Sequence, residues 1–161
     1  MKIRSFIRMP QTKVYPDTPL EKVWKLLSQR HIFLLPVVSE KNILLGVIEE
    51  EDLLYRLIPD YRDYFSEFFS QKPDISDLED RLEHDIILTA KDVVRKPVVS
   101  ISSDQDIFKA LSKLMAYHFR QLLVVDEGKF VGLIFEDDIV NYLLEKHKHI
   151  VKRHKKTTKK K

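Results

Sequence analysis

The stretch LGVIEEEDLLYRL at residues 45–57 recurs as VGLIFEDDIVNYL at residues 131–143. With one residue deleted in a turn, the match continues upstream. Positions that are identical in the two copies include Arg8 and Arg95, Pro10 and Pro97, Asp17 and Asp104, Leu27 and Leu114, His31 and His118, Leu35 and Leu122, Val37 and Val124, Val38 and Val125, Gly46 and Gly132, and Asp52 and Asp138. A unit of about 60 residues is therefore present twice. Because a duplicated unit usually packs against its copy, we predict two halves related by a pseudo-twofold axis, with the function in the clefts between them.

The first copy has a clear order of secondary structure. Apolar residues at helical spacing from Leu20 onward predict an amphipathic helix that is capped by Asp17 or Thr18 and ends near Arg30. The apolar runs LLPVV and ILLGVI, separated by the polar turn SEKN, predict two neighbouring strands. A short helix then begins at Asp52.

The second copy repeats this order. Ser103 or Asp104 is the expected cap of a helix that ends near Tyr117. The strands LLVVD and KFVGLI follow, joined by a turn at residues 127–128, and a last helix begins at about Asp137. With a short strand before the first helix, each copy is a β-α-β-β-α unit, and the expected fold class is α/β (α+β).

The charge is unevenly distributed along the chain. Residues 146–161 contain nine Lys or Arg residues and no acid, and subtracting these nine charges from the net charge of +3 leaves −6 on residues 1–145. A body of this sign is a poor general binder of phosphate backbones. The tail has two interpretations, a solubilising disordered end or a salt-dependent contact with nucleic acid or another anionic surface.

The composition also favours one cellular compartment. The chain has no cysteine, which rules out disulfides and thiolate metal sites and suits a reducing environment. The N-terminal residues MKIRSFIRMPQ lack an apolar signal region, and no stretch approaches about 20 apolar residues. We expect a cytoplasmic protein that does not enter the membrane.

The β-α-β-β-α order, with a Pro-Val-Val strand in the first copy and a Gly-x-x-x-x-x-Asp junction between strand and helix in both, resembles the CBS domain, named for cystathionine β-synthase. A tandem pair of such domains is called a Bateman module. On this resemblance the chain divides into CBS repeat 1 at residues 1–57, an aromatic helical connector at 58–88, CBS repeat 2 at 89–145, and a basic tail at 146–161. The resemblance implies that the two repeats pack as one module.

Pairs of this family typically bind adenosine-containing ligands such as AMP, ADP, ATP or S-adenosylmethionine, and they usually act as sensors. Their junction carries Gly-h-h-Thr/Ser-x-x-Asp, in which the hydroxyl and the helix N-terminus face phosphate and the carboxylate binds the ribose hydroxyls. The resemblance thus implies ribose contacts for Asp52 and Asp138, in junctions that begin at Gly46 and Gly132. Alternatively, both acids simply favour a helix N-terminus through capping and the macrodipole.

The hydroxyl position departs from the family pattern in both copies, with Glu49 in the first and Phe135 in the second. Residues 49–52 of the first copy are all acidic. Two like charges about 4 Å apart repel by roughly 4 kcal/mol at an effective dielectric of about 20. We therefore predict that the first cleft is empty or prefers a neutral or cationic adenosyl ligand, whereas Phe135 gives the second an apolar surface.

Five further residues complete the predicted site. Arg120 lies where family members often carry a phosphate-binding Arg or His, and its guanidinium could grip phosphate oxygens in a fork. Its alternative is an exposed ion pair. Adenine in this family lies against the strand before the first helix, which implies Val14 and Pro16 in one copy and Ile101 and Ser102 in the other. Val14 and Ile101 also suit the hydrophobic core.

The connector has an aromatic stripe at helical spacing, and residues 76–85 predict a second short helix. Its aromatic residues are Tyr61, Tyr64, Phe65, Phe68 and Phe69. One interpretation is that the stripe covers an exposed side of the module. The other is a dimer or partner surface, since aromatic residues are favoured interface anchors.

No catalytic pattern is present. The chain lacks a cysteine nucleophile and a Gly-rich phosphate loop, and the spacing of His147 and His149 has no companion acid to suggest a metal site. We predict a non-enzymatic regulatory protein that requires no cofactor, binds AMP, ADP, ATP or S-adenosylmethionine, and forms a homodimer or contacts a protein partner. The alternatives are a ligand-free dimeric scaffold and a module that contacts nucleic acid through the tail.

Overall fold

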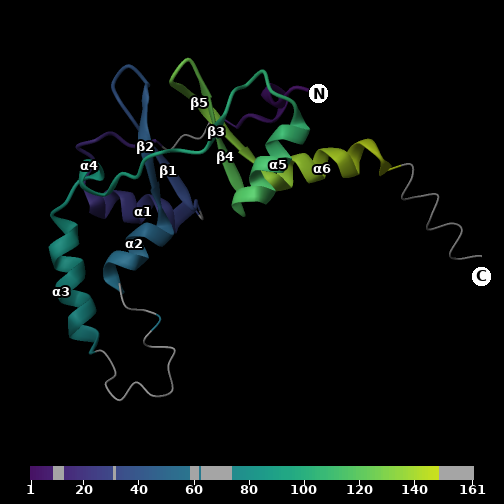
Figure 1. Cartoon of the computed structure of the whole chain (residues 1–161). Helices are drawn as coiled ribbons and strands as arrows, with labels where there is room; N and C mark the ends of the chain where they lie inside the picture. Colours follow the sequence, from purple (N-terminus) through teal and green to yellow (C-terminus); the bar gives the residue numbers. More distant parts are fainter. Residues whose placement is uncertain (9–12, 31, 59–61, 63–73, 149–161) are drawn as a thin grey trace, which may run out of the picture. The chain divides into compact units, whose positions relative to one another are not determined.

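The computed structural model describes residues 1–8, 13–30, 32–58, 62 and 74–148 (Figure 1). The predicted aromatic stripe of the connector and most of the basic tail lie outside these residues. In chain order the elements are η1 (Ile3–Phe6), α1 (Leu20–Arg30), β1 (Leu34–Val38), β2 (Leu44–Glu49), α2 (Glu50–Leu57), α3 (Ile75–Ile86), α4 (Ala90–Val93), β3 (Ser100–Ile101), α5 (Ile107–Tyr117), β4 (Gln121–Asp126), β5 (Lys129–Phe135) and α6 (Glu136–Lys146). Both copies show the predicted order of a helix, two strands and a helix, and the mixed α/β class is confirmed. Among the described residues, the strand predicted before the first helix appears only in the second copy, as β3.

The chain forms two compact units. The first comprises the described parts of Met1–Pro10, Val99–Glu127 and Val131–Lys161, and the second comprises those of Gln11–Val98 and Gly128–Phe130. Each unit has its own cluster of buried apolar side chains. Apolar burial is the main stabilising contribution to such a unit.

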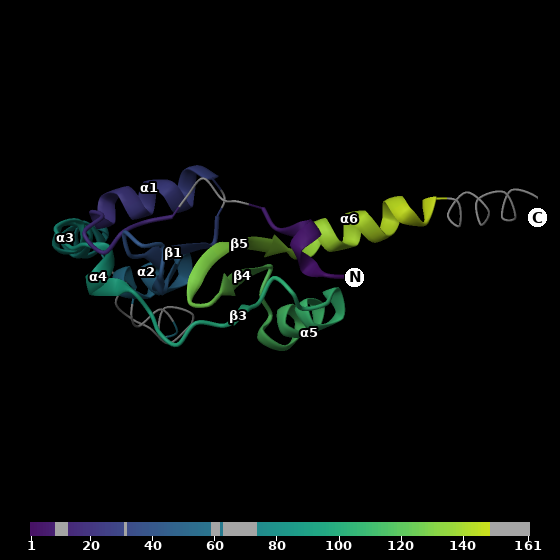
Figure 2. The ribbon, with the colours of Figure 1, turned by 90° about the horizontal axis from the view of Figure 1, so that it is seen from above.

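The first unit is built on a three-stranded sheet in the order β3-β4-β5. The short strand β3 pairs in parallel with β4, with Ser100 opposite Leu123. The buried cluster contains Ile3, Phe6, Ile101, Ile107, Ala110, Leu114, Leu122, Val124, Ile134 and Ile139. Figure 2 shows the N-terminal segment beside the start of α6, where the rings of Phe6 and Tyr142 meet edge to face at 5.1 Å.

The second unit is built on the antiparallel pair of β1 and β2. A single parallel bridge between Val14 and Val37 stands where β3 pairs with β4 in the other unit. The buried cluster contains Val14, Leu20, Val23, Leu27, Leu35, Val37, Ile48, Leu53 and Ala90. Figures 1 and 2 both show α3 and α4 near the beginning of α1, and the amide of Leu20 donates to the carbonyl of Leu88 at 2.9 Å.

The first segment of each repeat belongs to the unit that contains the strands of the other repeat. η1 lies in the unit of β4 and β5, and the backbones of Arg8 and Leu133 exchange two hydrogen bonds of 2.8 and 2.9 Å. Likewise, α4 lies in the unit of β1 and β2. The backbones of Arg95 and Val47 exchange two hydrogen bonds of 2.8 and 3.2 Å. The two exchanges involve equivalent residues, which extends the sequence repeat to the strand pairing.

Two details of the sequence prediction were wrong. The cap of α5 is Asp106, whose side chain accepts a hydrogen bond from the amide of Lys109 at 3.0 Å, and not Ser103 or Asp104. This bond holds the pKa of Asp106 below its usual value. Ser103 and Asp104 instead form a turn, in which Ser102 Oγ lies 2.8 Å from Oδ1 of Asp104. The second helix of the first copy begins at Glu50, two residues before Asp52.

The second helix predicted for the connector is confirmed. It is α3, which begins with a capping box in which the Asp74 side chain accepts from backbone amides and the Asp77 side chain accepts from the amide of Asp74. The box satisfies backbone donors at the helix start that would otherwise lack partners. The capping box therefore fixes the beginning of α3 at residue 75.

Candidate functional site

Each unit has a junction at which a strand passes directly into a helix. In both, the first helical amide donates to a carbonyl of the loop before the other strand. Glu50 donates to Phe33 at 3.0 Å, and Glu136 donates to Arg120 at 3.1 Å. The predicted acids Asp52 and Asp138 follow in the first helical turn. Neither helix has a hydrogen bond from a cap side chain, and the amide of Asp138 donates to the side chain of Asp137 at 3.0 Å.

In the first unit, Arg8 forms an ion pair with Asp138. The Arg8 guanidinium also lies over the ring of Phe135, 5.0 Å from its centroid. The side chain of Arg8 is 56% exposed and that of Asp138 is 19% exposed. The structure thus brings the predicted residues Phe135 and Asp138 together with an arginine that the prediction had not placed in the site.

The second unit has the same arrangement. Arg95 contacts Glu49 at 2.5 Å and Asp52 at 3.4 Å, so one guanidinium serves two carboxylates. The sequence prediction for the acids at residues 49–52 was mutual repulsion, with no cation among them. Arg95 therefore offsets part of the repulsion expected there, although Glu50 and Glu51 remain in the same helical turn.

Both aspartates have one oxygen atom without a partner. Oδ2 of Asp52 and Oδ2 of Asp138 are buried and accept no hydrogen bond within the described part of the chain. A buried carboxylate oxygen without a donor carries an uncompensated desolvation cost. A ligand hydroxyl that donated to this atom would remove that cost.

The two predicted glycines have a structural reason to be glycine. A Cβ atom on Gly132 would lie 2.6 Å from the carbonyl oxygen of Arg8, and one on Gly46 would lie 2.7 Å from that of Arg95. These contacts are too close for any side chain. The two glycines thus allow the backbones of Arg8 and Arg95 to lie close to β5 and β2. This close approach brings each arginine to its aspartate.

The remaining predicted residues lie in different surroundings. Val14 and Ile101 are 2% and 4% exposed and belong to the two hydrophobic clusters. Pro16 is half-buried, and its carbonyl accepts from the amide of Lys91 at 2.9 Å. Arg120 is exposed, and its backbone carbonyl reaches the junction through the bond with Glu136.

Ser102 belongs to a network with Asp126. The Ser102 hydroxyl donates to Asp126 at 2.7 Å, and the amide of Ser103 donates to the same oxygen at 2.9 Å. Hydrogen bonds from Ser103 and Ser102 hold the pKa of Asp126 below its usual value. Ser102 is thus already engaged by its neighbours.

Sequence reasoning missed Arg8 and Arg95 as site residues. The sequence did contain a signal. The two arginines are identical in the two copies, and a charged side chain is not needed for an apolar core, so its repetition indicates another role.

Among the residues that the structure describes, no group of three His, Cys, Asp or Glu side chains could hold a metal ion. Within the same residues, no helix is long and apolar enough to cross a membrane.

Comparison with known proteins identifies the repeated unit. The CBS domain family matches residues 3–59 and 90–145, which together are more than half of the chain. An uncharacterized protein of Methanopyrus kandleri is 24% identical over 125 residues, which cover 77% of this chain and 53% of that protein. The chain thus spans about half the length of that relative.

Solved structures agree in fold. The CBS domain of a CBS-domain-containing membrane protein from Sphaerobacter thermophilus has a TM-score of 0.64 and 27% identity, covering 88% of this chain and 86% of that chain. The CBS-pair protein CBSX2 from Arabidopsis thaliana has a TM-score of 0.69 and 21% identity, covering 91% and 96%. A crystal structure of CBSX2 in complex with AMP has a TM-score of 0.66 and 22% identity, covering 89% and 96%.

Proposed function

Because this chain belongs to the family of CBS-domain proteins, we propose that it is a regulatory CBS pair that binds an adenosine-containing ligand at its strand-to-helix junctions. The ligand class comprises AMP, ADP, ATP and S-adenosylmethionine. The AMP complex of CBSX2, a protein of the same fold, supports this class. Binding would shift the protein between two states only as far as the ligand prefers one of them.

The observation that carries this proposal is the unpartnered carboxylate oxygen in each junction. Asp52 and Asp138 each hold one oxygen against an arginine and keep a second oxygen buried without a donor. A ribose offers two neighbouring hydroxyl donors, and an ionised carboxylate has acceptor capacity for both. A ribose at this position would supply the donors that the junction lacks.

The first unit is the better candidate for a ligand with phosphate. Its junction has Phe135 where the second unit has Glu49, so it carries one carboxylate fewer. The exposed side chain of Arg8 can move from Asp138 to a phosphate, since both are anionic oxygen acceptors. For the second unit, the additional carboxylate of Glu49 favours a neutral or cationic adenosyl ligand.

The test is a thermal-shift panel with AMP, ADP, ATP, S-adenosylmethionine, adenosine and GTP, on protein checked by mass spectrometry for a copurified ligand. A ligand at 100 times its dissociation constant adds about 2.7 kcal/mol, which corresponds to roughly 5–10 °C for a chain of this size. The expected result is a selective rise with one or more adenosyl compounds. No rise, with nothing copurified, would contradict the proposal.

A pair of variants locates the site. Asp138→Ala should abolish the shift caused by a nucleotide in the first unit. Glu136→Ala removes one acidic side chain from the same helical turn, where Glu136 is exposed, and should keep the shift. Equal effects of the two substitutions would indicate a general charge effect and exclude a specific role of Asp138.

A second candidate function is a ligand-free dimeric scaffold. It is favoured by the fact that both aspartates already have an arginine partner and that neither junction has the family hydroxyl. In this case no adenosyl compound should bind. Replacement of Tyr64 and Phe68, which lie outside the described residues, should then abolish self-association in sedimentation experiments.

A further inference from the structure

A second polar site lies away from the junctions, between α2 and α3. Here a pocket of about 340 Å³ is lined by Arg56, Arg81, His84 and Asp85. This volume is at the lower end of the range of small-molecule sites, roughly 300–1,000 Å³. α3, which supplies the other three lining residues, lies outside both stretches that match the CBS domain, whereas Arg56 lies within the first of them.

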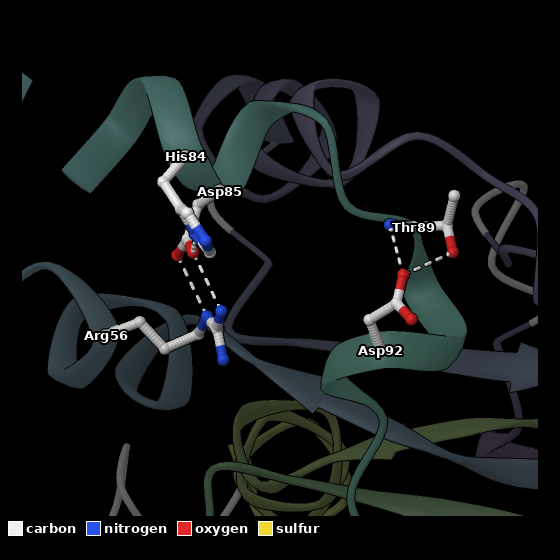
Figure 3. A network of polar contacts seen from close by, with 5 residues as sticks. All are labelled: Arg56, His84, Asp85, Thr89 and Asp92. Carbon is white, nitrogen blue, oxygen red and sulfur yellow. Dashed lines mark hydrogen bonds and ion pairs between the residues drawn. The ribbon is translucent and has the colours of Figure 1, made fainter. Parts of the chain in front are cut away.

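The floor of this pocket is a fixed ion pair. Arg56 Nε and Nη2 donate to the two oxygens of Asp85 at 2.8 and 2.7 Å (Figure 3). Asp85 is only 5% exposed, and the hydrogen bonds from Arg56 hold its pKa below the usual value against the opposing effect of burial. The carboxylate thus fixes the plane of the guanidinium.

Arg56 keeps donors for a further partner. Figure 3 shows its third nitrogen, Nη1, pointing away from Asp85. The other nearby carboxylate is that of Asp92, which accepts from both the amide and the hydroxyl of Thr89 at 2.8 Å. No hydrogen bond joins Nη1 to a described residue, so it is available to a ligand.

Arg81 supplies a second guanidinium. Its Nη1 donates to the carbonyl of Leu57 at 3.1 Å, which anchors the half-buried side chain at the end of α2. The remaining Arg81 nitrogens have no partner among the described residues. The side chains that line this pocket thus include two guanidiniums, one paired carboxylate and the imidazole of His84.

From this arrangement we propose that the pocket between α2 and α3 binds a phosphate group. Fixed guanidiniums with free donors match the tetrahedral oxygens of phosphate, which accept two hydrogen bonds from one fork. The group arrives either as inorganic phosphate or as the phosphate of a small monoester. The residues that line this site are different from those proposed to bind an adenosyl ligand at the junctions.

The experiment titrates the full chain with inorganic phosphate at constant ionic strength and records the arginine Nε–H and histidine ring signals by NMR. A saturable shift of the signals of Arg56, Arg81 and His84 is the expected result. Acetate at the same ionic strength should produce no saturable shift. Absence of a saturable phosphate shift would overturn the proposal.

Matched variants separate binding from folding and from general charge. Arg81→Gln removes one guanidinium, leaves the Arg56–Asp85 pair intact and should weaken phosphate binding about tenfold or more. Lys22→Gln removes one exposed positive charge from α1 in the same unit and should leave the affinity unchanged. Equal weakening by both substitutions, or none by Arg81→Gln, would overturn the site.

A second titration with glycerol 3-phosphate identifies the source of the phosphate group. Tighter binding than inorganic phosphate would support a monoester as the ligand. Equal or weaker binding would support the free anion. Asp138→Ala should change neither titration, because Asp138 belongs to the other unit.

Discussion

Arg8 and Asp138 form an ion pair although 130 positions separate them in the sequence. The pair exists because the N-terminal segment packs in the unit that contains β5 and α6. Arg95 and Asp52 repeat the relationship in the other unit. Each aspartate proposed to bind ribose is thus held by an arginine from the first segment of the other repeat.

The first prediction concerns the competition between Arg8 and a ligand for Asp138. Arg8→Gln should increase the affinity for adenosine by up to about fivefold, because the ligand no longer has to break an exposed ion pair, which is typically worth about 0.2–1 kcal/mol. For AMP, the loss of a cation that can bind phosphate opposes this gain. The ratio of AMP to adenosine affinity, measured by calorimetry, should therefore fall.

The control for this prediction is Arg4→Gln. Arg4 is an exposed arginine of η1 in the same N-terminal segment, and it is not among the residues of the junction. It should leave the affinity ratio unchanged. A ratio that did not respond to Arg8→Gln would show that Arg8 does not meet the phosphate.

The second prediction concerns Gly132, where a Cβ would lie 2.4 Å from Ile7 Cγ2 and 2.6 Å from the carbonyl oxygen of Arg8. Gly132→Ala should lower the free energy of unfolding by about 1–3 kcal/mol, because a backbone atom cannot move aside as a side chain can. Urea denaturation followed by circular dichroism measures the loss.

Gly128 provides the comparison for this substitution. It has a φ of +77° and no atom within 4 Å of a built Cβ, so Gly128→Asn meets no clash and places a residue that tolerates this conformation. Its cost should be well below that of Gly132→Ala. If Gly132→Ala were as stable as the original chain, the close approach of the N-terminal segment would be wrong.

The order of elements could be predicted from the sequence because its signals are local. The run LLPVV forms β1, and the helical spacing after Leu20 forms α1, as the apolar pattern indicated. The cap of α5 was missed because Ser103, Asp104 and Asp106 are all residue types that suit a helix start. Backbone geometry selects Asp106 among them.

The exchange of segments between repeats could not be predicted, because strand pairing depends on packing between residues far apart in sequence. Its trace in the sequence is the pair Gly46 and Gly132, since glycine inside a strand often marks a close backbone approach. The acids of the junctions were found from the repeat. Their arginine partners were not, because the alignment places Arg8 and Arg95 outside the junction motif.

The third prediction is an asymmetry between the partners of the Arg56–Asp85 pair. The side chain of Arg56 is 36% exposed and that of Asp85 is 7% exposed. Arg56→Met leaves a buried carboxylate without its cation and should lower the free energy of unfolding by a few kcal/mol. Removing one partner of a fully buried ion pair costs roughly 3–5 kcal/mol, and the loss here should not exceed that range. Asp85→Asn leaves an arginine that can turn to solvent, so its cost should be smaller.

The double variant Arg56→Met with Asp85→Leu checks the cause of this asymmetry. Replacing both charges by apolar groups removes the uncompensated carboxylate, so much of the stability lost in Arg56→Met should return. A double variant less stable than Arg56→Met would show that packing, and not the unpaired charge, causes the loss.

The fourth prediction is the pH dependence of stability that Asp85 produces. Hydrogen bonds from Arg56 are the main cause of its lowered pKa, and the ordinary value is 3.8. A carboxyl whose pKa is lower in the folded state contributes stability that is complete above the unfolded value and is lost as the pH falls through the folded one. The free energy of unfolding should therefore decrease as the pH is lowered below about 4.

Asp85→Asn separates this contribution from those of other carboxyls. The pKa values of Asp106 and Asp126 are also lowered, the first mainly by the amide of Lys109 and the second mainly by Ser103. The variant should consequently retain an acid-induced loss of stability, but with a smaller slope against pH, because one proton fewer is taken up on unfolding. Urea denaturation of both proteins at several values between about pH 2 and pH 6 measures the slopes, and equal slopes would exclude Asp85 as a source of the acid sensitivity.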